Sequence, residues 1–272
     1  MCRVLGAVAS RQLSIRHELL EAENPFIRQS EEHDSGWGMA VYGRAEGEEP
    51  RLVRFASAAF ADPGFEESTE LRGRIFNAHV RRATLGGLSL ANTHPFSLGA
   101  FSFSHNGTVI DFPRLRGNGV ADADGETDSE QLFHFLMSRY SGADPVGSFR
   151  EGIGEVIRRS PFSGLNFLFS DGERLFAYRL GIFDLHWLER DEQVLVSSER
   201  ATPEPWHVVQ QDVLLVLDPA RPGVHAERLV GDDLVAAADI RKFEEGAHLR
   251  GEERGAFAAE RVARITAQAH AP

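Results

Sequence analysis

The chain of 272 residues contains a single cysteine, Cys2. One cysteine cannot form an internal disulfide, and it excludes metal sites built from Cys-x-x-Cys pairs. Positive charge is also scarce, because 29 Lys and Arg residues stand against 41 Asp and Glu residues, for a formal net charge of −12. Phosphates would repel such a chain, so the composition argues against nucleic acid and against anionic membranes as partners.

Long hydrophobic runs are missing as well. The opening MCRVLGAVAS is apolar for only a few residues before Arg11 and Arg16, which is too short for a signal peptide or a membrane span. We therefore expect a cytoplasmic protein. Its 42% apolar and 26% charged residues are typical of a soluble globular protein, and no repeat or low-complexity segment is visible.

What the sequence does have is its one cysteine directly after Met1. Because cysteine is small, we expect methionine aminopeptidase to remove Met1 and leave Cys2 first. That residue would then carry a thiol with a reference pKa of about 8.5 and a free α-amine of about 7.7–8.0, close enough for easy proton exchange. One interpretation is an N-terminal nucleophile that uses its own amine as base. The other is a chance cysteine at a frayed terminus.

The hydrophobic pattern predicts strands in both halves of the chain and two helices between them. The strands are expected at residues 4–9, 36–42, 75–80, 99–104, 167–169, 175–180, 182–188, 194–197 and 213–217. The two central helices are expected at 130–140 and 145–159, after a further helix at 13–22. This order favours layered sheets covered by helices over a βαβ alternation. We expect one domain over residues 2–246, followed by a polar helix or tail at 247–272.

Three polar clusters stand at the ends of predicted elements. Arg81 follows a strand, and its guanidinium suits a two-point clamp on a carboxylate, although a solvated strand end fits equally well. Asn106 and Gly107 offer a side-chain amide and a backbone N–H for an oxyanion, but Asn-Gly is also the strongest hairpin signal, and spacing alone favours the turn. Asp128 heads a helix, where it can act as a cap, hold an ammonium group, or do both.

The order of these motifs is more informative than any one of them. Met-Cys-Arg, HDSGWG, AHVRRAT, NTHPF, SHNG and ETDSE follow one another between Cys2 and Glu130. This series resembles the glutaminase domain of the class II, or N-terminal nucleophile, glutamine amidotransferases. The resemblance implies an α+β fold, a four-layer αββα sandwich with two mostly antiparallel sheets.

The chain is most similar to the small stand-alone members of that family, including the ergothioneine-pathway γ-glutamyl hydrolases. Arg82 stands where large biosynthetic members have an aromatic residue. An arginine expected before Asp34 is absent, and Glu31 and Glu32 lie nearby instead. These departures bear on the identity of the substrate more than on the type of reaction.

The resemblance implies that Cys2 is the nucleophile, with its α-amine as general base, and that Asn106 and the backbone of Gly107 form the oxyanion hole. The implied reaction is hydrolysis of a side-chain amide through a thioester, followed by release of glutamate. No metal and no cofactor are implied.

The resemblance also implies how the substrate is held. Arg81 matches the residue that binds the α-carboxylate, Thr84 lines the same pocket, and Asp128 receives the α-ammonium. The substrate is then glutamine or a γ-glutamyl compound. Two alternatives stay open, a glutaminase subunit that supplies ammonia to a separate synthase and a non-catalytic glutamine-binding regulatory protein. Hydrolysis of other acyl groups, as in penicillin V acylases and bile-salt hydrolases, is disfavoured because a plain acyl chain needs no clamp of Arg81 with Asp128.

Overall fold

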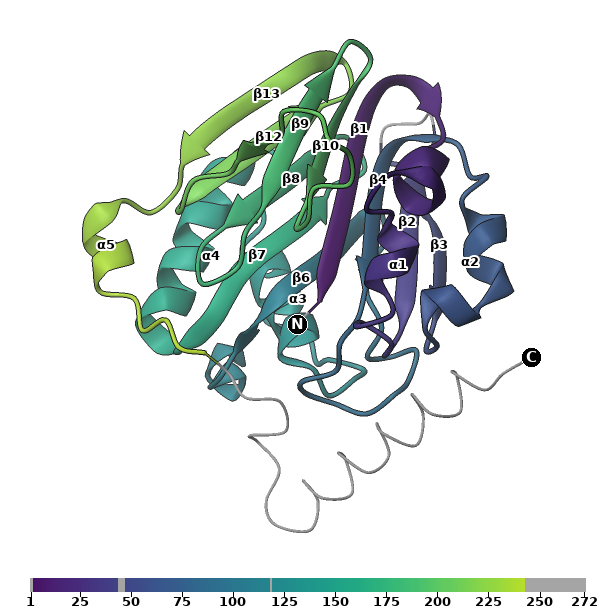
Figure 1. Cartoon of the computed structure of the whole chain (residues 1–272). Coiled ribbons are helices and arrows are strands. Elements are labelled where there is room, and N and C mark those ends of the chain that lie inside the picture. The colour runs from purple at the N-terminus through teal and green to yellow at the C-terminus, as the bar shows by residue number, and fades with distance from the viewer. Residues whose placement is uncertain (1, 44–46, 118, 243–272) are drawn as a thin grey trace.

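The computed structural model describes residues 2–43, 47–117 and 119–242, and every structural statement below concerns these residues (Figure 1). Two antiparallel sheets face each other. The seven-stranded sheet has the order β11-β9-β10-β1-β4-β2-β3, and the six-stranded sheet has the order β13-β12-β8-β7-β6-β5.

The strands are bounded as follows. The seven-stranded sheet consists of β1 (Arg3–Leu13), β2 (Trp37–Tyr42), β3 (Arg51–Phe55), β4 (Gly73–Val80), β9 (His186–Arg190), β10 (Gln193–Ser197) and β11 (His207–Val208). The six-stranded sheet consists of β5 (Phe96–Leu98), β6 (Phe101–Val109), β7 (Phe162–Ser170), β8 (Leu175–Arg179), β12 (Val213–Asp218) and β13 (Arg221–Arg228).

Helices cover the outer face of each sheet (Figure 1). On the seven-stranded sheet lie η1 (His17–Glu21), α1 (Phe26–Gln29), η2 (Ala59–Ala61) and α2 (Pro63–Ser68). On the six-stranded sheet lie η3 (Phe112–Leu115), α3 (Asp128–Met137), α4 (Pro145–Arg159) and α5 (Asp232–Ala236). The predicted four-layer αββα arrangement is confirmed.

Strand alternation decides which side chains meet between the sheets. Val4 and Val8 of β1 pack in the inter-sheet core, whereas Leu5 and Ala7 pack against the helices. In β6, Phe103 faces α3 and α4, so the alternate residues face the seven-stranded sheet. The inter-sheet layer is therefore apolar around β1, β8 and β12 and polar along β6, where Ser102, Ser104 and Asn106 face the seven-stranded sheet.

Most predicted elements are confirmed, and α4 has the predicted bounds. The helix predicted at residues 13–22 is confirmed only in part, because β1 continues to Leu13, which pairs with Gly73. Only His17–Glu21 forms a helical turn there. Strand pairing along the whole of β1 outweighs the helical spacing of the apolar residues that follow.

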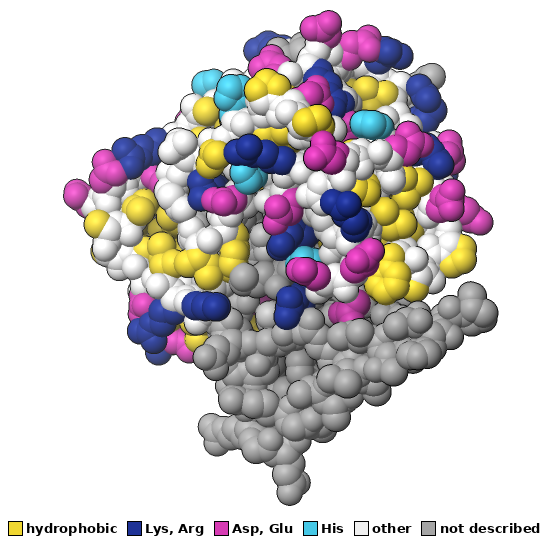
Figure 2. Space-filling view, viewed as in Figure 1, with side chains coloured by type: hydrophobic (Ala, Val, Ile, Leu, Met, Phe, Trp, Pro, Cys, Tyr) yellow, Lys and Arg dark blue, Asp and Glu magenta, His cyan; other side chains and the backbone are white. Residues whose placement is uncertain are grey.

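The charges of the chain are mixed on the surface. Figure 2 shows Asp and Glu side chains interspersed with Arg side chains, so the net charge of −12 is not gathered into one acidic patch on this face. Within the described ranges, no helix combines the length and the apolar character needed to cross a bilayer. The predicted boundary at residue 246 and the predicted tail at 247–272 lie outside the described residues.

Candidate active site

The pairing of β1 with β4 brings Cys2 beside Arg81. Arg3 pairs with Val80, so the next position outward joins Cys2 and Arg81. The Cys2 thiol is half-buried, and its Sγ lies 3.7 Å from the carbonyl oxygen of Arg82, to which it donates. Two motifs 79 residues apart in the sequence thus meet at one end of the central sheet.

The HDSGWG motif adjoins Arg81 on its other side. The backbone N–H of Arg81 donates to the carbonyl of Gly36 at 2.7 Å, and the N–H of Ser35 donates to the carbonyl of Arg81 at 2.8 Å. Gly36 has a φ of 143°, a conformation that favours glycine. This backbone pairing fixes the position from which the Arg81 side chain leaves the sheet.

The thiol of Cys2 faces the six-stranded sheet. Cys2 lies two residues before Val4, whose side chain packs between the sheets, and alternation gives both side chains the same direction. Arg81 likewise shares a face with His79, whose Nε2 donates to the carbonyl of His105 in β6 at 3.3 Å. Both residues therefore face β6 across the inter-sheet layer.

Asn106 and Gly107 lie inside β6 and pair with Asn166 and Leu165 of β7. The hairpin turn that spacing alone favoured is therefore wrong. Glycine is needed because a Cβ at position 107 would overlap the backbone of Gly164 in the neighbouring strand. The dipeptide marks a close approach of two strands rather than a reversal of the chain.

The side chain of Asn106 lies on the face of β6 that is turned toward the seven-stranded sheet, because strand alternation places it opposite to Phe103. It is 1% exposed, and its Oδ1 has no hydrogen-bond partner among the described residues. A buried amide oxygen without a partner costs about 1–3 kcal/mol. Several other buried side chains, among them Ser104 and Thr108 of the same strand, also have a polar atom without a partner, so this oxygen alone does not mark a ligand site.

Asp128 is the first residue of α3 and not its cap. The cap is Thr127, whose side chain accepts from the N–H of Glu130 at 3.2 Å. Asp128 instead accepts from the N–H of Val109 through Oδ2 at 2.8 Å, which ties the start of α3 to the end of β6. The predicted head-of-helix position is confirmed, with the capping role corrected.

Burial raises the pKa of Asp128 to about 7, although the backbone N–H of Val109 and the positive charge of Arg81 oppose this shift. The nearby imidazole of His105, with Nδ1 at 4.0 Å from Oδ2, does not supply a positive charge. Its Nε2 donates to the carbonyl of Gly164, and burial lowers its pKa to about 4. Nδ1 therefore accepts from the hydroxyl of Ser129 at 2.9 Å. The site thus contains a deeply buried carboxyl that an incoming cation would stabilise in its charged form.

The guanidinium of Arg81 holds the loop that follows β4. It donates to the carbonyls of Leu85 at 2.8 Å, Gly86 at 3.2 Å and Gly87 at 3.0 Å. Thr84 lies half-buried in this loop. Arg81 thus arranges the segment that carries Thr84, a role that the sequence did not predict.

Asn92 and Glu126 fasten the same loop from outside. The Asn92 amide donates to the carbonyl of Gly87 at 3.0 Å, and its oxygen accepts from the N–H of Glu126 at 2.8 Å. The two residues open the NTHPF and ETDSE motifs, so their place in those motifs was the available signal. These contacts give both motifs a structural role at the site.

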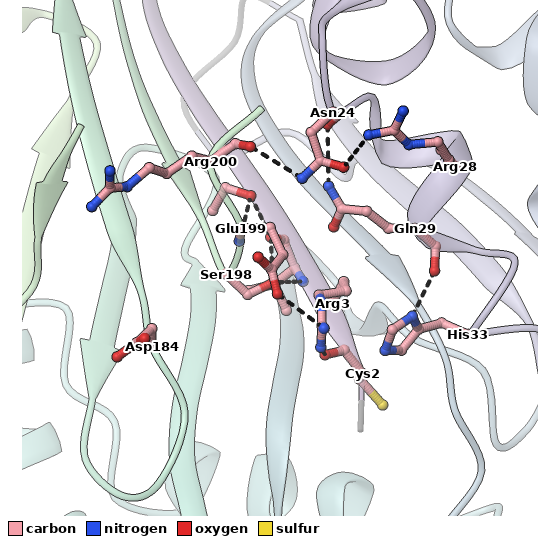
Figure 3. Close-up of polar contacts among 12 residues, drawn as sticks. Cys2, Arg3, Asn24, Arg28, Gln29, His33, Asp184, Ser198, Glu199 and Arg200 are labelled. Carbon is pink, nitrogen blue, oxygen red and sulfur yellow. Dashed lines mark hydrogen bonds and ion pairs between the residues drawn. The ribbon is translucent and has the colours of Figure 1, made fainter. Parts of the chain in front are cut away.

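His33 was also missed as a site residue. It is 3% exposed, and its Nδ1 donates to the carbonyl of Gln29 at 2.6 Å. Burial, together with the charges of Arg3 and Arg82, lowers its pKa to about 3. The ring lies beside Cys2, with Nε2 on the side of Arg3 and Cys2 (Figure 3). Its position in the HDSGWG motif was the only signal.

Two facing antiparallel sheets with outer helices, and a cysteine directly before a central strand, fit the fold of the N-terminal nucleophile hydrolases. Residues 1–212 match the family model of the class-II glutamine amidotransferases. The chain belongs to this family. Among the described residues, no group of three or more His, Cys, Asp and Glu side chains is arranged to hold a metal ion.

Known proteins support the family and the fold. An uncharacterized protein of Methanocaldococcus jannaschii is 34% identical over 205 residues, which are 70% of this chain and 54% of that protein. The structure of a glutamine aminotransferase class-II domain protein from Silicibacter pomeroyi has a TM-score of 0.60 at 22% identity and covers 85% of this chain and 100% of that one. Glutamine phosphoribosylpyrophosphate amidotransferase from B. subtilis has a TM-score of 0.63 at 17% identity over 85% of this chain and 50% of that one.

The chain spans about half the length of several curated relatives that it matches. The structural likenesses, all with low sequence identity, concern the fold alone. The similarity to ergothioneine-pathway hydrolases and the roles of the six predicted site residues stay predictions.

Proposed function

We propose that this protein hydrolyses the side-chain amide of glutamine or of a γ-glutamyl compound through a thioester on Cys2. The observation that carries the proposal is the placement of the Cys2 thiol beside Arg81 and facing the strand that contains Asn106 and Gly107. The three groups come from separate elements at one end of the inter-sheet layer: the nucleophile Cys2, the cation Arg81 and the amide donor Asn106.

The glutamyl head is held by two opposite charges. Its ammonium group pairs with Asp128, whose burial makes the isolated carboxylate costly and the ion pair correspondingly favourable. Its carboxylate pairs with Arg81, which also holds the loop that contains Thr84. Only an amino-acid head offers both charges at a fixed separation, so the pair selects glutamyl compounds over plain acyl amides.

The reaction proceeds in two halves once Met1 has been removed. The α-amine of Cys2 takes the thiol proton, the sulfur attacks the γ-carbonyl carbon, and the oxyanion accepts from the Asn106 amide and the N–H of Gly107. The carbon–nitrogen bond then breaks, and the α-ammonium returns its proton to the departing nitrogen. Water attacks the thioester with the amine again as base, the carbon–sulfur bond breaks, and glutamate leaves with a free thiol restored.

The direct test is glutamate release from purified full-length protein with glutamine and a panel of γ-glutamyl amides. Release of glutamate together with the free amine supports the proposal. Tight glutamine binding without release of glutamate would favour the regulatory-protein alternative instead. Slow release that a co-purifying synthase accelerates would favour the ammonia-supplying subunit.

Replacing Asn106 by alanine removes the side-chain donor to the oxyanion. We expect kcat to fall by about 10²–10³ with little change in KM, because the bond strengthens only in the transition state. Steady-state kinetics on glutamine measures both constants. Asn166→Ala is the control, since Asn166 is the neighbour of Asn106 in β7 and donates to the carbonyl of Phe183 instead. An equal loss of kcat in both variants would contradict the assigned role.

Arg81→Lys keeps the positive charge but loses the planar guanidinium, whose paired N–H donors can bind a carboxylate at two points. We expect KM for glutamine to rise about 10–100-fold, because one ammonium cannot hold both the loop carbonyls and a carboxylate in two-point geometry. Limited proteolysis should also cleave the loop at residues 82–88 faster than in the wild type. If KM is unchanged while the loop is cleaved faster, Arg81 holds the loop and does not bind the substrate carboxylate.

A further inference from the structure

A cavity of about 320 Å³ lies next to the start of β1. Three segments form its walls: Arg3 of β1, the stretch from Asn24 to His33, and Glu199 after β10 (Figure 3). Because Arg3 shares a face with Leu5, the cavity lies on the helix side of the sheet, around the strand end from the Cys2 thiol. The α-amine of a processed Cys2 belongs to this strand end.

Most of the hydrogen-bond donors in these walls are already engaged. Arg3 pairs with Glu199 at 2.9 Å and donates to the carbonyl of Cys2 at 3.2 Å. Arg28 donates to the side-chain oxygen of Asn24 at 3.3 Å. A ligand in this cavity therefore meets arginines whose terminal N–H groups already have acceptors, and the remaining donor of Arg3, Nε, is buried without a partner among the described residues.

Apart from Nε of Arg3, the groups that remain are acceptors, including the buried Oε1 of Gln29, which has no partner among the described residues. Since Nδ1 of His33 donates to Gln29, Nε2 carries the lone pair, and it has no partner among the described residues. Glu31 and Glu32 are exposed in the cavity wall and form no ion pair within the described part of the chain. Arg3 and Glu199 form an ion pair and neutralise each other. The other charged groups in the wall are the carboxylates of Glu31 and Glu32 and the guanidinium of Arg28. The neutral His33 adds no charge.

We propose that this cavity takes the amine half of a γ-glutamyl amide, and that this amine carries a second, positively charged group. The inference rests on the proposed function. The departing nitrogen receives its proton from the α-amine of Cys2, so it leaves at the start of β1, next to Arg3, which lines the cavity together with His33. The hydrogen-bond acceptors and carboxylates in the cavity wall favour an amine with a second positive charge, such as a diamine, over a neutral or anionic amine.

The test compares three substrates of matched length: the γ-glutamyl amides of butanediamine, of butylamine and of γ-aminobutyrate. We expect kcat/KM to be highest for the cationic amide, about tenfold above the neutral one and further above the anionic one. The preference should weaken as salt is added, since Glu31 and Glu32 are exposed.

The double variant Glu31→Gln/Glu32→Gln should lose the preference while glutamine hydrolysis stays within about twofold. Glu66→Gln/Glu67→Gln, which removes the same charge from α2, should keep it. Equal rates on the three amides, or a preference that survives the first double variant, would overturn the inference and leave the proposed function standing if glutamine is hydrolysed. Failure to hydrolyse any of the four compounds would overturn both.

Discussion

Cys2→Ala is expected to lower glutamate release by at least about 10⁴-fold, because the variant has no atom that can form the acyl intermediate. Stability should change by less than about 0.5 kcal/mol, since the thiol makes only a long hydrogen bond to the carbonyl of Arg82. Alanine, like cysteine, is small enough to permit removal of Met1. Kinetics, thermal unfolding and intact mass together check these expectations.

Glutamine binding separates loss of chemistry from loss of fold. Arg81 and Asp128 are untouched in Cys2→Ala, so calorimetry should give a Kd within about threefold of the wild-type value. Cys2→Ser keeps a nucleophilic atom at the same place and should retain slow turnover. If wild type and Cys2→Ala bind glutamine equally and neither releases glutamate, the protein is a binding protein and the catalytic account is wrong.

Asp128→Asn is expected to raise the free energy of unfolding and, at the same time, to lower the activity of the enzyme on glutamine. The folded-state pKa of about 7 lies above the ordinary aspartate value of 3.8, so the proton on Asp128 stabilises the fold fully below pH 3.8. This contribution is lost as the pH rises through 7. Asparagine keeps an acceptor for the N–H of Val109 and carries no charge. The variant should therefore be more stable by roughly 4 kcal/mol at pH 8 and gain little at pH 4.

The same substitution should reduce kcat/KM for glutamine by about 10²–10³, because a buried amide cannot neutralise an ammonium group. In the wild type, KM should rise as the pH falls below about 7, since the free enzyme must release the proton of Asp128 before it binds substrate. That rise should be absent from the variant.

Asp144→Asn is a matched control for Asp128→Asn. Asp144 is an exposed carboxylate that caps α4 by accepting from the N–H of Gly147 at 2.9 Å. Asparagine caps equally well, so neither stability nor KM should change. A loss of stability in Asp128→Asn at pH 8 would show that the carboxylate is structural and would remove the main support for the ammonium site.

Much of the fold could be predicted from local patterns. The apolar run of β2, which is buried on both faces, and the apolar stripe of α4 were sufficient, because each pattern is local. β13 was missed, since the polar segment Arg221–Arg228 becomes a strand only through its pairing with β12. The helix expected at residues 13–22 begins later than predicted, because Leu13 belongs to β1, whose pairing partners lie far away in the sequence.

The candidate site divides in the same way. The order of the motifs indicated that Cys2 and Arg81 belong together, and the register of β1 and β4 agrees. The spacing of Asn106-Gly107 predicted a turn. The close approach of the Gly164 backbone to Gly107, which explains the glycine, comes from a distant segment that spacing does not reveal. The neutral state of His33 and the cavity beside it depend on burial by separate segments, which no local pattern records.

The central claim is that Cys2, as the first residue, carries the glutamyl group during turnover. The most direct measurement is mass spectrometry of the full-length protein quenched in acid while it hydrolyses glutamine, followed by peptide mapping. The account predicts loss of Met1 and one glutamyl group attached to Cys2, absent from Cys2→Ala. Turnover by a protein that retains Met1, or a glutamyl group on any other residue, would contradict it.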